Sequence, residues 1–319
     1  MGCGAACVAN VAVCFNLRAR VRPRDSGRKR TSHGMGNKMI REITIGLLAL
    51  AASAACANAQ SGAAMARGKY LVDTVMTCHN CHTPRGPNGL IMDKALSGGL
   101  RFNEPPFDVT ASNITGDRET GIGAWSVEDI KKLLSTGVRP NGIPVADIMP
   151  TAFYKVLTAD DLTAIATYVH SLPPVKNAVP APVYKIKLPP TMVPNADKPM
   201  TKADLSDKLK MGFYLVTIAH CMECHSPMGP KGRDFSRTGA GGFELPGPWG
   251  VSVSRNITSS KSKGLGNWTD DEIKRAITQG ISRDGSKLKP PMGYPFYAKM
   301  TPADLDAIVA YLRTVPAID

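Results

Sequence analysis

The sequence predicts an all-α protein in which two copies of one small helical unit follow each other along the chain. Two observations lead to this prediction. The same landmarks recur at a constant offset of 143 residues, as from Cys78 to Cys221, and apolar stripes with helical spacing follow capping residues in both halves. No strand-like alternation of useful length appears. The length of 319 residues and the hydrophobic content of 43% allow two ordinary globular cores.

The N-terminus of the chain reads as a targeting segment. Residues 39–59, MIREITIGLLALAASAACANA, combine a charged start at Arg41, an apolar run over 43–55 and an A-x-A cleavage pattern at 57–59. This order is typical of a secretory signal peptide, and cleavage would leave Gln60 at the mature N-terminus. The apolar run is shorter than the ~20 residues that span a bilayer. We therefore expect a periplasmic protein with no transmembrane anchor after cleavage, so that any membrane association is peripheral.

Basic residues near the N-terminus account for much of the net charge of +13. Residues 1–59 hold nine Lys or Arg against two Asp or Glu. Residues 1–38 form a basic leader without an evident role, which translation from Met35 or Met39 would omit. The remaining charge forms no basic stripe with interleaved aromatic residues, so we do not expect a nucleic-acid partner.

The mature part of the chain contains one unit twice. We expect the first repeat over 60–175 and the second repeat over 201–319. Matching landmarks are CHNCH at 78–82 and CMECH at 221–225, the Asn-Ile-Thr triplets at 113–115 and 256–258, and the pairs Trp125 and Trp268, Gly137 and Gly280, Met149 and Met292, and Tyr168 and Tyr311. One residue is inserted before the first CHNCH, because 68–72 matches 212–216 at an offset of 144.

Each repeat is expected to hold three helices, the first of them just before the cysteines. The middle helices begin at the N-caps Ser126 and Thr269 and end at a glycine. The last helices begin at the N-caps Thr158 and Thr301. Their buried stripes are Leu162, Ile165, Ala166 and Val169 in the first repeat and Leu305, Ile308, Val309 and Leu312 in the second.

A proline-rich linker over 176–200 separates the two expected domains. The stretch 173–200 contains eight prolines, which make it extended and fairly stiff. We expect an ordered strap, because apolar side chains give it a grip on the domains, and a mobile linker is the alternative. The gripping residues are Val175, Val179, Tyr184, Ile186 and Leu188.

Each repeat carries the pattern C-x-x-C-H, which zinc, a disulfide or haem could use. The residues are Cys78, Cys81 and His82 in the first repeat and Cys221, Cys224 and His225 in the second. A structural zinc site needs four ligands, so the two clusters would have to combine across the repeats. A disulfide in each pair would leave the histidines unexplained. C-x-x-C-H is the attachment signature of c-type haem, in which both thiols bind the haem and the adjacent histidine binds the iron. The pattern therefore favours two covalently bound haems c.

A second protein ligand for each iron is expected from methionine, which raises the reduction potential of haem c. Met149 in ADIMPTAFY and Met292 in KPPMGYPFY recur at matching positions, in a loop between the middle and last helices. Core packing is the alternative role of a methionine. The matching loops, bounded by proline and glycine, favour iron ligation.

Other residues near the motifs have less defined roles. His79 and His220 are out of register with the attachment motif, and we expect them to be surface residues. Trp125 and Trp268 could either donate their ring N–H to a haem propionate or anchor the packing at the start of a helix.

Taken together, these motifs resemble the multihaem, here dihaem, cytochrome c subunits of bacterial alcohol, aldehyde and gluconate dehydrogenases. The resemblance rests on both C-x-x-C-H motifs, both Asn-Ile-Thr triplets, the stretches TGIGAW at 120–125 and GLGNW at 264–268, and the two methionines. It covers nearly all of 60–319 and implies tandem class I cytochrome c domains. It also implies that His82 and Met149 bind one iron, and that His225 and Met292 bind the other. Many such subunits have a third haem domain and a C-terminal membrane anchor, whereas this chain ends at Asp319.

The function that the resemblance implies is electron transfer. Two haems with histidine and methionine ligands would pass electrons from a periplasmic dehydrogenase to a respiratory acceptor, either a cytochrome or a terminal oxidase, by Fe(II)/Fe(III) cycling. The alternative is a dihaem enzyme, a peroxidase or a thiosulfate-oxidising cytochrome, in which one axial ligand is labile. Both repeats carry a methionine at the ligand position, and haem uses all four mature cysteines. We therefore favour a non-catalytic electron-transfer protein or the cytochrome subunit of a dehydrogenase complex.

Overall fold

The structure, a computed structural model, describes residues 60–188, 190–230, 232–247 and 249–319. The expected leader (1–38) and signal peptide (39–59) lie outside these residues. The chain divides into residues 1–63 and 64–319, and the fold below is that of the second part. Within the described part of the chain, no helix is both long enough and apolar enough to cross a bilayer.

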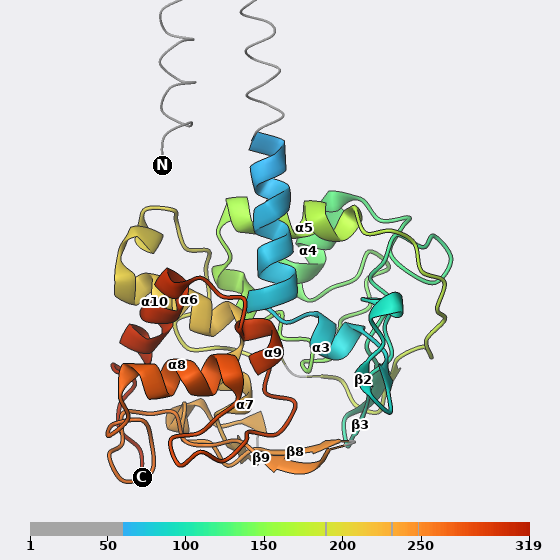
Figure 1. The fold of residues 1–319 in the computed structure, drawn as a ribbon. Coiled ribbons are helices and arrows are strands. Elements are labelled where there is room, and N and C mark those ends of the chain that lie inside the picture. The colour runs from blue at the N-terminus through green and yellow to red at the C-terminus, as the bar shows by residue number, and fades with distance from the viewer. Residues whose placement is uncertain (1–59, 189, 231, 248) are drawn as a thin grey trace, which may run out of the picture. The chain divides into compact units, whose positions relative to one another are not determined.

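The first repeat contains short helices and small hairpins (Figure 1). Residues 64–70 are helical and continue into a π-helical turn. The elements that follow are η1 (Leu71–Val75), α3 (His79–His82), β1 (Arg85–Gly86), β2 (Gly89–Leu90), η2 (Met92–Lys94), β3 (Arg101–Glu104), β4 (Phe107–Thr110), α4 (Val127–Thr136), η3 (Phe153–Val156), α5 (Ala159–His170) and β5 (Val183–Tyr184).

The second repeat runs through nearly the same order of elements. They are η4 (Asp204–Ser206), α6 (Lys208–Ile218), α7 (Cys221–Cys224), β6 (Met228–Gly229), β7 (Gly232–Arg233), η5 (Phe235–Arg237), β8 (Glu244–Gly247), β9 (Gly250–Val253), α8 (Asp270–Gln279), α9 (Tyr294–Tyr297) and α10 (Pro302–Leu312). The repeated sequence landmarks therefore correspond to repeated structural elements, with α7 matching α3, α8 matching α4 and α10 matching α5.

The predicted helix caps are confirmed. Ser126 and Thr269 each form a capping box with the residue three positions on, and Thr158 and Thr301 each accept a backbone N–H with their hydroxyl. The middle helices end at Gly137 and Gly280, which have φ values of 72° and 66°. This left-handed conformation costs glycine little, so the two helices end at these residues.

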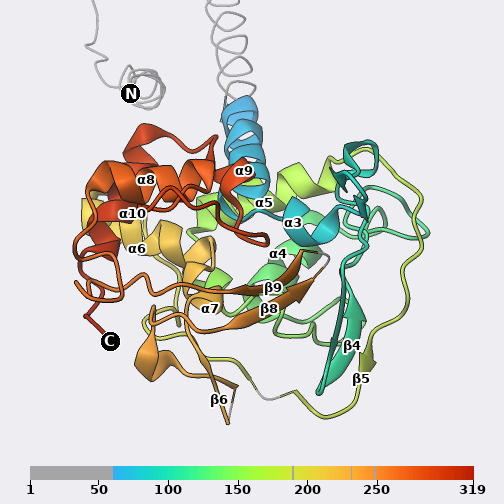
Figure 2. The same cartoon turned by 60° about the horizontal axis from the view of Figure 1, so that its bottom comes forward.

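Two glycines allow the first and last helices of each repeat to cross in close contact. A Cβ atom on Gly212 in α6 would lie 2.1 Å from the Ala307 carbonyl oxygen in α10, and one on Gly68 would lie 2.1 Å from the Ala164 carbonyl oxygen in α5. The two helices α6 and α10 lie side by side in Figures 1 and 2. The backbones can approach this closely because glycine has no side chain.

The expectation of an all-α fold is only partly right, because short strands are present. Strands β3, β4 and β5 form a three-stranded antiparallel sheet, and β8 and β9 form a hairpin. Phe107 and Val109 of β4 are buried with Ala146 in a second, smaller core. Their alternation covers only four residues, which is too short to be recognised as a strand from the sequence alone.

The proline-rich stretch after α5 returns to the first repeat as a strap. Tyr184 of β5 pairs with Phe107 of β4, and β5 lies beside β4 in Figure 2. The Met200 N–H then donates to the Val156 carbonyl at 2.9 Å. Ile186, expected to grip the domain, is instead 55% exposed, so that part of the expectation is wrong.

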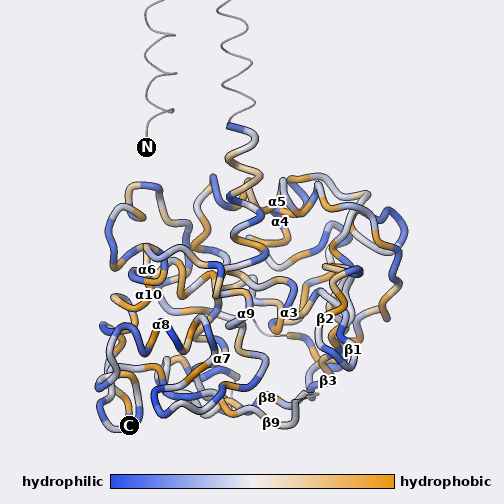
Figure 3. Tube along the Cα trace, viewed as in Figure 1, coloured by the Kyte–Doolittle hydropathy of each residue, from blue (hydrophilic) through white to orange (hydrophobic). Residues whose placement is uncertain are grey.

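The larger hydrophobic core extends through both repeats. Its largest fully buried side chains include Leu71, Leu157 and Ile165 of the first repeat and Tyr214 and Ile273 of the second. Figure 3 shows hydrophobic stretches along α5 and α10 and hydrophilic stretches in outer loops. The repeats therefore form one unit over 64–319, because burial of the shared apolar surface holds them together.

Two hydrogen bonds also cross between the repeats in opposite directions. The Tyr70 hydroxyl donates to Asp304 Oδ2 at 2.5 Å, and the Tyr214 hydroxyl donates to Asp161 Oδ2 at 2.6 Å. Tyr70 and Tyr214 match each other in the repeat, as do Asp161 and Asp304. The two repeats thus meet through a reciprocal pair of contacts.

Candidate functional site

Each C-x-x-C-H motif forms a single helical turn, α3 or α7. Thr77 precedes the first motif with φ of 49°, and His220 precedes the second with φ of 45°. Both residues therefore have the left-handed conformation, which is uncommon outside glycine. Because the strained residue stands at the same place in both repeats, we infer that it sets the direction in which each turn leaves the preceding helix.

None of the four cysteines that the structure describes forms a disulfide. Burial raises the pKa of Cys78, Cys81 and Cys221 to about 12, and it raises the pKa of Cys224 in the same way. The thiols therefore stay protonated near neutral pH, unlike the thiolates of a redox-active cysteine pair. Each pair lies within one turn, as attachment to a single group requires.

The two motif histidines are oriented by the same hydrogen bond. His82 Nδ1 lies 2.7 Å from the Ser112 carbonyl oxygen, and His225 Nδ1 lies 2.6 Å from the Arg255 carbonyl oxygen. A carbonyl only accepts, so Nδ1 carries the proton in both rings and Nε2 keeps its lone pair. Burial lowers the pKa of both histidines, which favours the neutral ring. This arrangement fixes the tautomer that binds a metal through Nε2.

The structure does not support a zinc site. Among residues 60–319, apart from 189, 231 and 248, no group of three or more His, Cys, Asp or Glu side chains is placed to hold a metal ion. Structural zinc takes four such ligands. Each histidine instead follows its own two cysteines within one short helical segment, which suits attachment of one haem in each repeat.

The two methionine loops are placed alike. A β-bridge between Val138 and Pro144 precedes Met149, and a matching bridge between Ile281 and Lys287 precedes Met292. Both methionines are partly buried and pack against the shared core. Their ligation of iron stays a prediction.

Two buried arginine atoms fit the acidic groups of a haem. The Nε atoms of Arg85 and Arg275 are buried, and neither has a hydrogen-bond partner among the residues that the structure describes. A buried arginine N–H needs an acceptor, and haem propionates are strong acceptors. The thiols, the histidines with free Nε2 atoms, the methionines and these arginines together fit two covalently bound haems.

The sequence did not single out two tyrosines that lie beside the cysteine pairs. Burial raises the pKa of Tyr154 and Tyr297 well above the usual value, and nearby cysteines reinforce both shifts. The two tyrosines are 143 residues apart, so the repeat offset could have identified them.

One of the two histidines that the sequence predicts to be at the surface, His79, is buried. His79 is only 7% exposed, and its ring lies 2.9 Å from Thr83 Oγ1 and 3.2 Å from Asp73 Oδ1. The expectation of a surface residue is therefore wrong, because these polar partners and the ring of Phe296 cover the side chain. His220 is half-buried and pairs with Glu223 at 3.0 Å. Trp125 and Trp268 pack against the shared core, and a role toward propionates stays a prediction.

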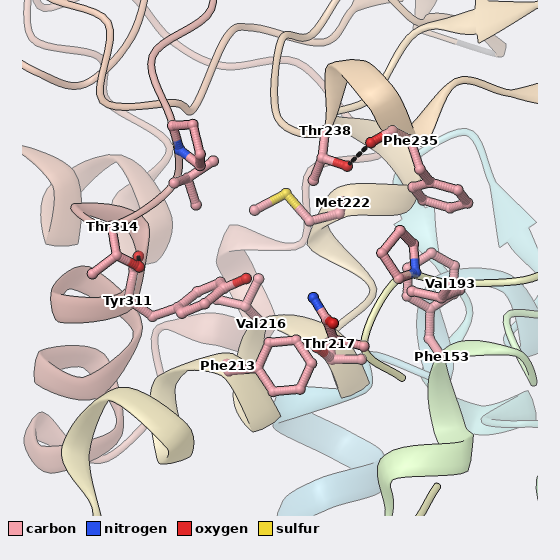
Figure 4. A pocket seen from close by; sticks show the side chains of 14 residues that line it. Phe153, Val193, Phe213, Val216, Thr217, Met222, Phe235, Thr238, Tyr311 and Thr314 are labelled. Carbon is pink, nitrogen blue, oxygen red and sulfur yellow. Dashed lines mark hydrogen bonds between the residues drawn. The ribbon is translucent and has the colours of Figure 1, made fainter. Parts of the chain in front are cut away.

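A cavity of about 350 Å³ lies where the repeats and the strap meet (Figure 4). Its walls are mostly apolar and aromatic and include Phe153, Phe213, Phe235, Tyr311 and Met222. Met222 stands between the two attachment cysteines of α7. Among the residues that the structure describes, no charged side chain lines the cavity, and the predicted haem-binding residues do not line it either.

Comparison with known proteins confirms the expected resemblance. Residues 210–316 match the cytochrome c family model. The chain is 28% identical over 294 residues to the cytochrome c subunit of an alcohol dehydrogenase (quinone) of Gluconobacter oxydans, covering 86% of this chain and 59% of that protein. It is 27% identical over 300 residues to the cytochrome c subunit of a gluconate 2-dehydrogenase of Pantoea cypripedii, covering 88% and 66%. A diheme c-type cytochrome of Cereibacter sphaeroides is 28% identical over 253 residues, covering 76% and 83%.

The chain therefore spans about three fifths to two thirds of the length of these two dehydrogenase subunits. The similarity to these relatives covers both repeats of this chain, whereas the family model matches the second repeat.

Proposed function

We propose that this chain, which is similar to the cytochrome c subunits of bacterial dehydrogenases, transfers electrons through two covalently bound haems c. The observation that carries the proposal is the matched pair of sites, each with two half-buried thiols and a histidine held by Nδ1 to a backbone carbonyl. In this proposal Cys78 and Cys81 attach the first haem, and Cys221 and Cys224 attach the second.

The axial ligands in this proposal are His82 and Met149 at one iron and His225 and Met292 at the other. When bound, each haem supplies one-electron Fe(II)/Fe(III) chemistry, and a methionine ligand raises its potential. The carbonyls of Ser112 and Arg255 keep the imidazoles neutral and oriented. The shared core limits movement of both methionine loops, so the ligands can stay in place when the charge on the iron changes.

The proposed donor is a periplasmic dehydrogenase, and the proposed acceptor is a cytochrome or a terminal oxidase. The named relatives support a dehydrogenase partner, because two of them are cytochrome subunits of such enzymes. Location in the periplasm rests on the signal-peptide pattern at 39–59.

Intact mass and carbon monoxide binding test the proposal. The mature protein should carry the mass of two haems, and the variants Cys78→Ala/Cys81→Ala and Cys221→Ala/Cys224→Ala should each carry one. The spectrum of the reduced protein should change only slowly with carbon monoxide, because methionine must leave either iron before the gas can bind. Two haems in either double variant would refute the attachment sites, and prompt carbon monoxide binding at one haem would support a dihaem enzyme instead.

A further inference from the structure

The first attachment segment packs directly on the methionine loop of the second repeat. Asn80, which lies between Cys78 and Cys81, donates from Nδ2 to the Pro291 carbonyl oxygen at 2.7 Å. That carbonyl belongs to the peptide bond that joins Pro291 to Met292. The elements α3 and α9 lie side by side in Figures 1 and 2.

Two further contacts surround this hydrogen bond. The ring of His79 stacks on Phe296 with centroids 5.9 Å apart and planes 8° from parallel. A Cβ atom on Gly293 would lie 3.1 Å from the Thr77 methyl group, so the loop and the segment are in close contact on both sides of Met292.

The amide of Asn80 is itself held in one orientation. Arg85 Nη2 donates to Asn80 Oδ1 at 2.6 Å and to the Asn80 carbonyl oxygen at 3.0 Å. The Arg85 guanidinium lies over the Trp249 ring, 5.3 Å from its centroid. Because arginine only donates, the amide oxygen must face Arg85, and the NH2 group is left to face Pro291.

The two methionine loops are anchored in different ways. In the first repeat the Met149 N–H donates to the Ala146 carbonyl at 2.9 Å, and the Met149 carbonyl accepts from the Thr151 N–H at 2.7 Å. In the second repeat two prolines, Pro290 and Pro291, precede Met292, and proline has no N–H to donate. A side chain from the other repeat supplies the anchor at this point.

The second attachment segment cannot make the equivalent hydrogen bond to the methionine loop of the first repeat. The residue that matches Asn80 is Glu223, and its carboxylate pairs with His220 at 3.0 Å. An ionised carboxylate has no hydrogen to donate, so Glu223 cannot make the matching bond to Ile148, which stands at the place of Pro291.

We propose that Asn80 is a positioning residue for the second haem site, which holds the Met292 loop so that its sulfur stays on the iron. Retention of the second methionine ligand then depends on the attachment segment of the first haem. This inference rests on the proposed function, because it takes Met292 to be an axial ligand.

The test uses the mature protein with both haems. Asn80→Leu and Asn80→Asp both remove the N–H donors, the first without adding charge and the second without changing shape. The reduced variants should bind carbon monoxide at the second haem about two- to tenfold faster than the wild type. Methionine must leave the iron before carbon monoxide binds, and loss of one hydrogen bond from its loop should speed this step by that factor. Asn267→Leu is the control, because Asn267 donates a similar bond to the Lys261 carbonyl at 2.8 Å in the second repeat, away from the loop. It should leave the rate unchanged.

Met292→Leu identifies the second haem in the same experiment, since it should open that iron to carbon monoxide and remove its share of the sulfur-to-iron charge-transfer absorption of the ferric protein. If Met292→Leu changes neither signal, the ligand assignment fails and the positioning role fails with it. If Met292→Leu changes both signals while the two Asn80 variants bind carbon monoxide at the wild-type rate, the positioning role alone is overturned. A faster reaction in the Asn80 variants at the haem that Met149→Leu opens would overturn it as well.

Discussion

Asp161 and Asp304 occupy matching positions on α5 and α10, but among the described residues only Asp161 forms an ion pair with an arginine. Arg67 donates from Nε and Nη2 to the two carboxylate oxygens of Asp161, each at 2.8 Å. The residue that matches Arg67 is Met211, which carries no charge. Each aspartate also accepts from a tyrosine of the other repeat. The two tyrosine–aspartate contacts between the repeats therefore match in topology, but the contact at Asp161 is reinforced by an arginine.

Because the two tyrosine–aspartate contacts differ in this way, we expect their removal to lower the free energy of unfolding by different amounts. Tyr70→Phe removes the tyrosine partner of Asp304, a carboxylate that is only 7% exposed and makes no ion pair with a described residue. Tyr214→Phe leaves Asp161 with its bidentate arginine. We expect Tyr70→Phe to lower the free energy of unfolding by about 1–3 kcal/mol, the cost of leaving a buried acceptor without its partner, and Tyr214→Phe to cost less.

Urea unfolding of the haem-loaded protein measures both losses. Tyr184→Phe serves as the control, because the Tyr184 hydroxyl donates to the Pro144 carbonyl at 2.6 Å on the exposed side of the strap. Its effect should be small, since water can replace the tyrosine there. An equal or larger loss from Tyr214→Phe would show that the arginine does not compensate for the missing hydroxyl.

The hydrogen bond between Tyr70 and Asp304 also predicts that the free energy of unfolding falls at alkaline pH. Burial raises the pKa of Tyr70 from 10.0 to about 12, and the hydrogen bond to Asp304 adds to the shift. Between these two pH values the unfolded chain releases a proton that the folded chain keeps, so the stabilising contribution is complete below pH 10 and is lost as the pH rises toward 12. The difference in unfolding free energy between the wild type and Tyr70→Phe should therefore shrink over this interval. A difference that stays constant from pH 8 to pH 12 would contradict the raised pKa.

Replacing the predicted methionine ligands should change one haem at a time. Met149→Leu should lower the potential of the first haem and Met292→Leu that of the second, because thioether sulfur favours ferrous iron. We expect changes on the order of 0.1 V, within the ~0.8 V range over which axial ligands set haem potentials. A redox titration followed by absorption measures both potentials.

Met300→Leu is the matched control for the ligand variants. Met300 is 7% exposed in the shared core, and the residue that matches it in the first repeat is Leu157, so its replacement should leave both potentials unchanged. If Met149→Leu keeps both wild-type potentials, Met149 is not an iron ligand. The mass of the variant would show whether both haems are still attached.

The sequence predicts best those features that depend on neighbouring residues. The caps at Ser126 and Thr269 and the glycine stops at Gly137 and Gly280 follow from local hydrogen bonding and backbone conformation, so both repeats show them as expected. The repeat offset also placed each cysteine pair and its histidine within one turn without any knowledge of the fold.

Features that depend on contacts between distant segments could not be predicted in this way. Burial of His79 requires Phe296 from the other repeat, more than two hundred positions along the chain. The role of Asn80 depends on Pro291, which the sequence does not connect with it. Strand β5 was missed because its pairing with β4 requires the strap to fold back onto the first repeat.

The glycine at the helix crossing provides a last prediction about the fold itself. A methyl group on Gly212 would lie 2.1 Å from a backbone carbonyl oxygen that cannot move without shifting α10. We expect Gly212→Ala to lower the free energy of unfolding by about 1–3 kcal/mol, the usual cost of overpacking. Alanine normally stabilises a helix interior relative to glycine by about 0.5–1 kcal/mol, so the crossing must reverse the usual sign. Gly229→Ala is the control, because a Cβ atom there meets its nearest atom at an ordinary 3.5 Å. Chemical denaturation of the two variants decides the matter, and a Gly212→Ala protein as stable as the wild type would mean that α6 and α10 do not cross this closely.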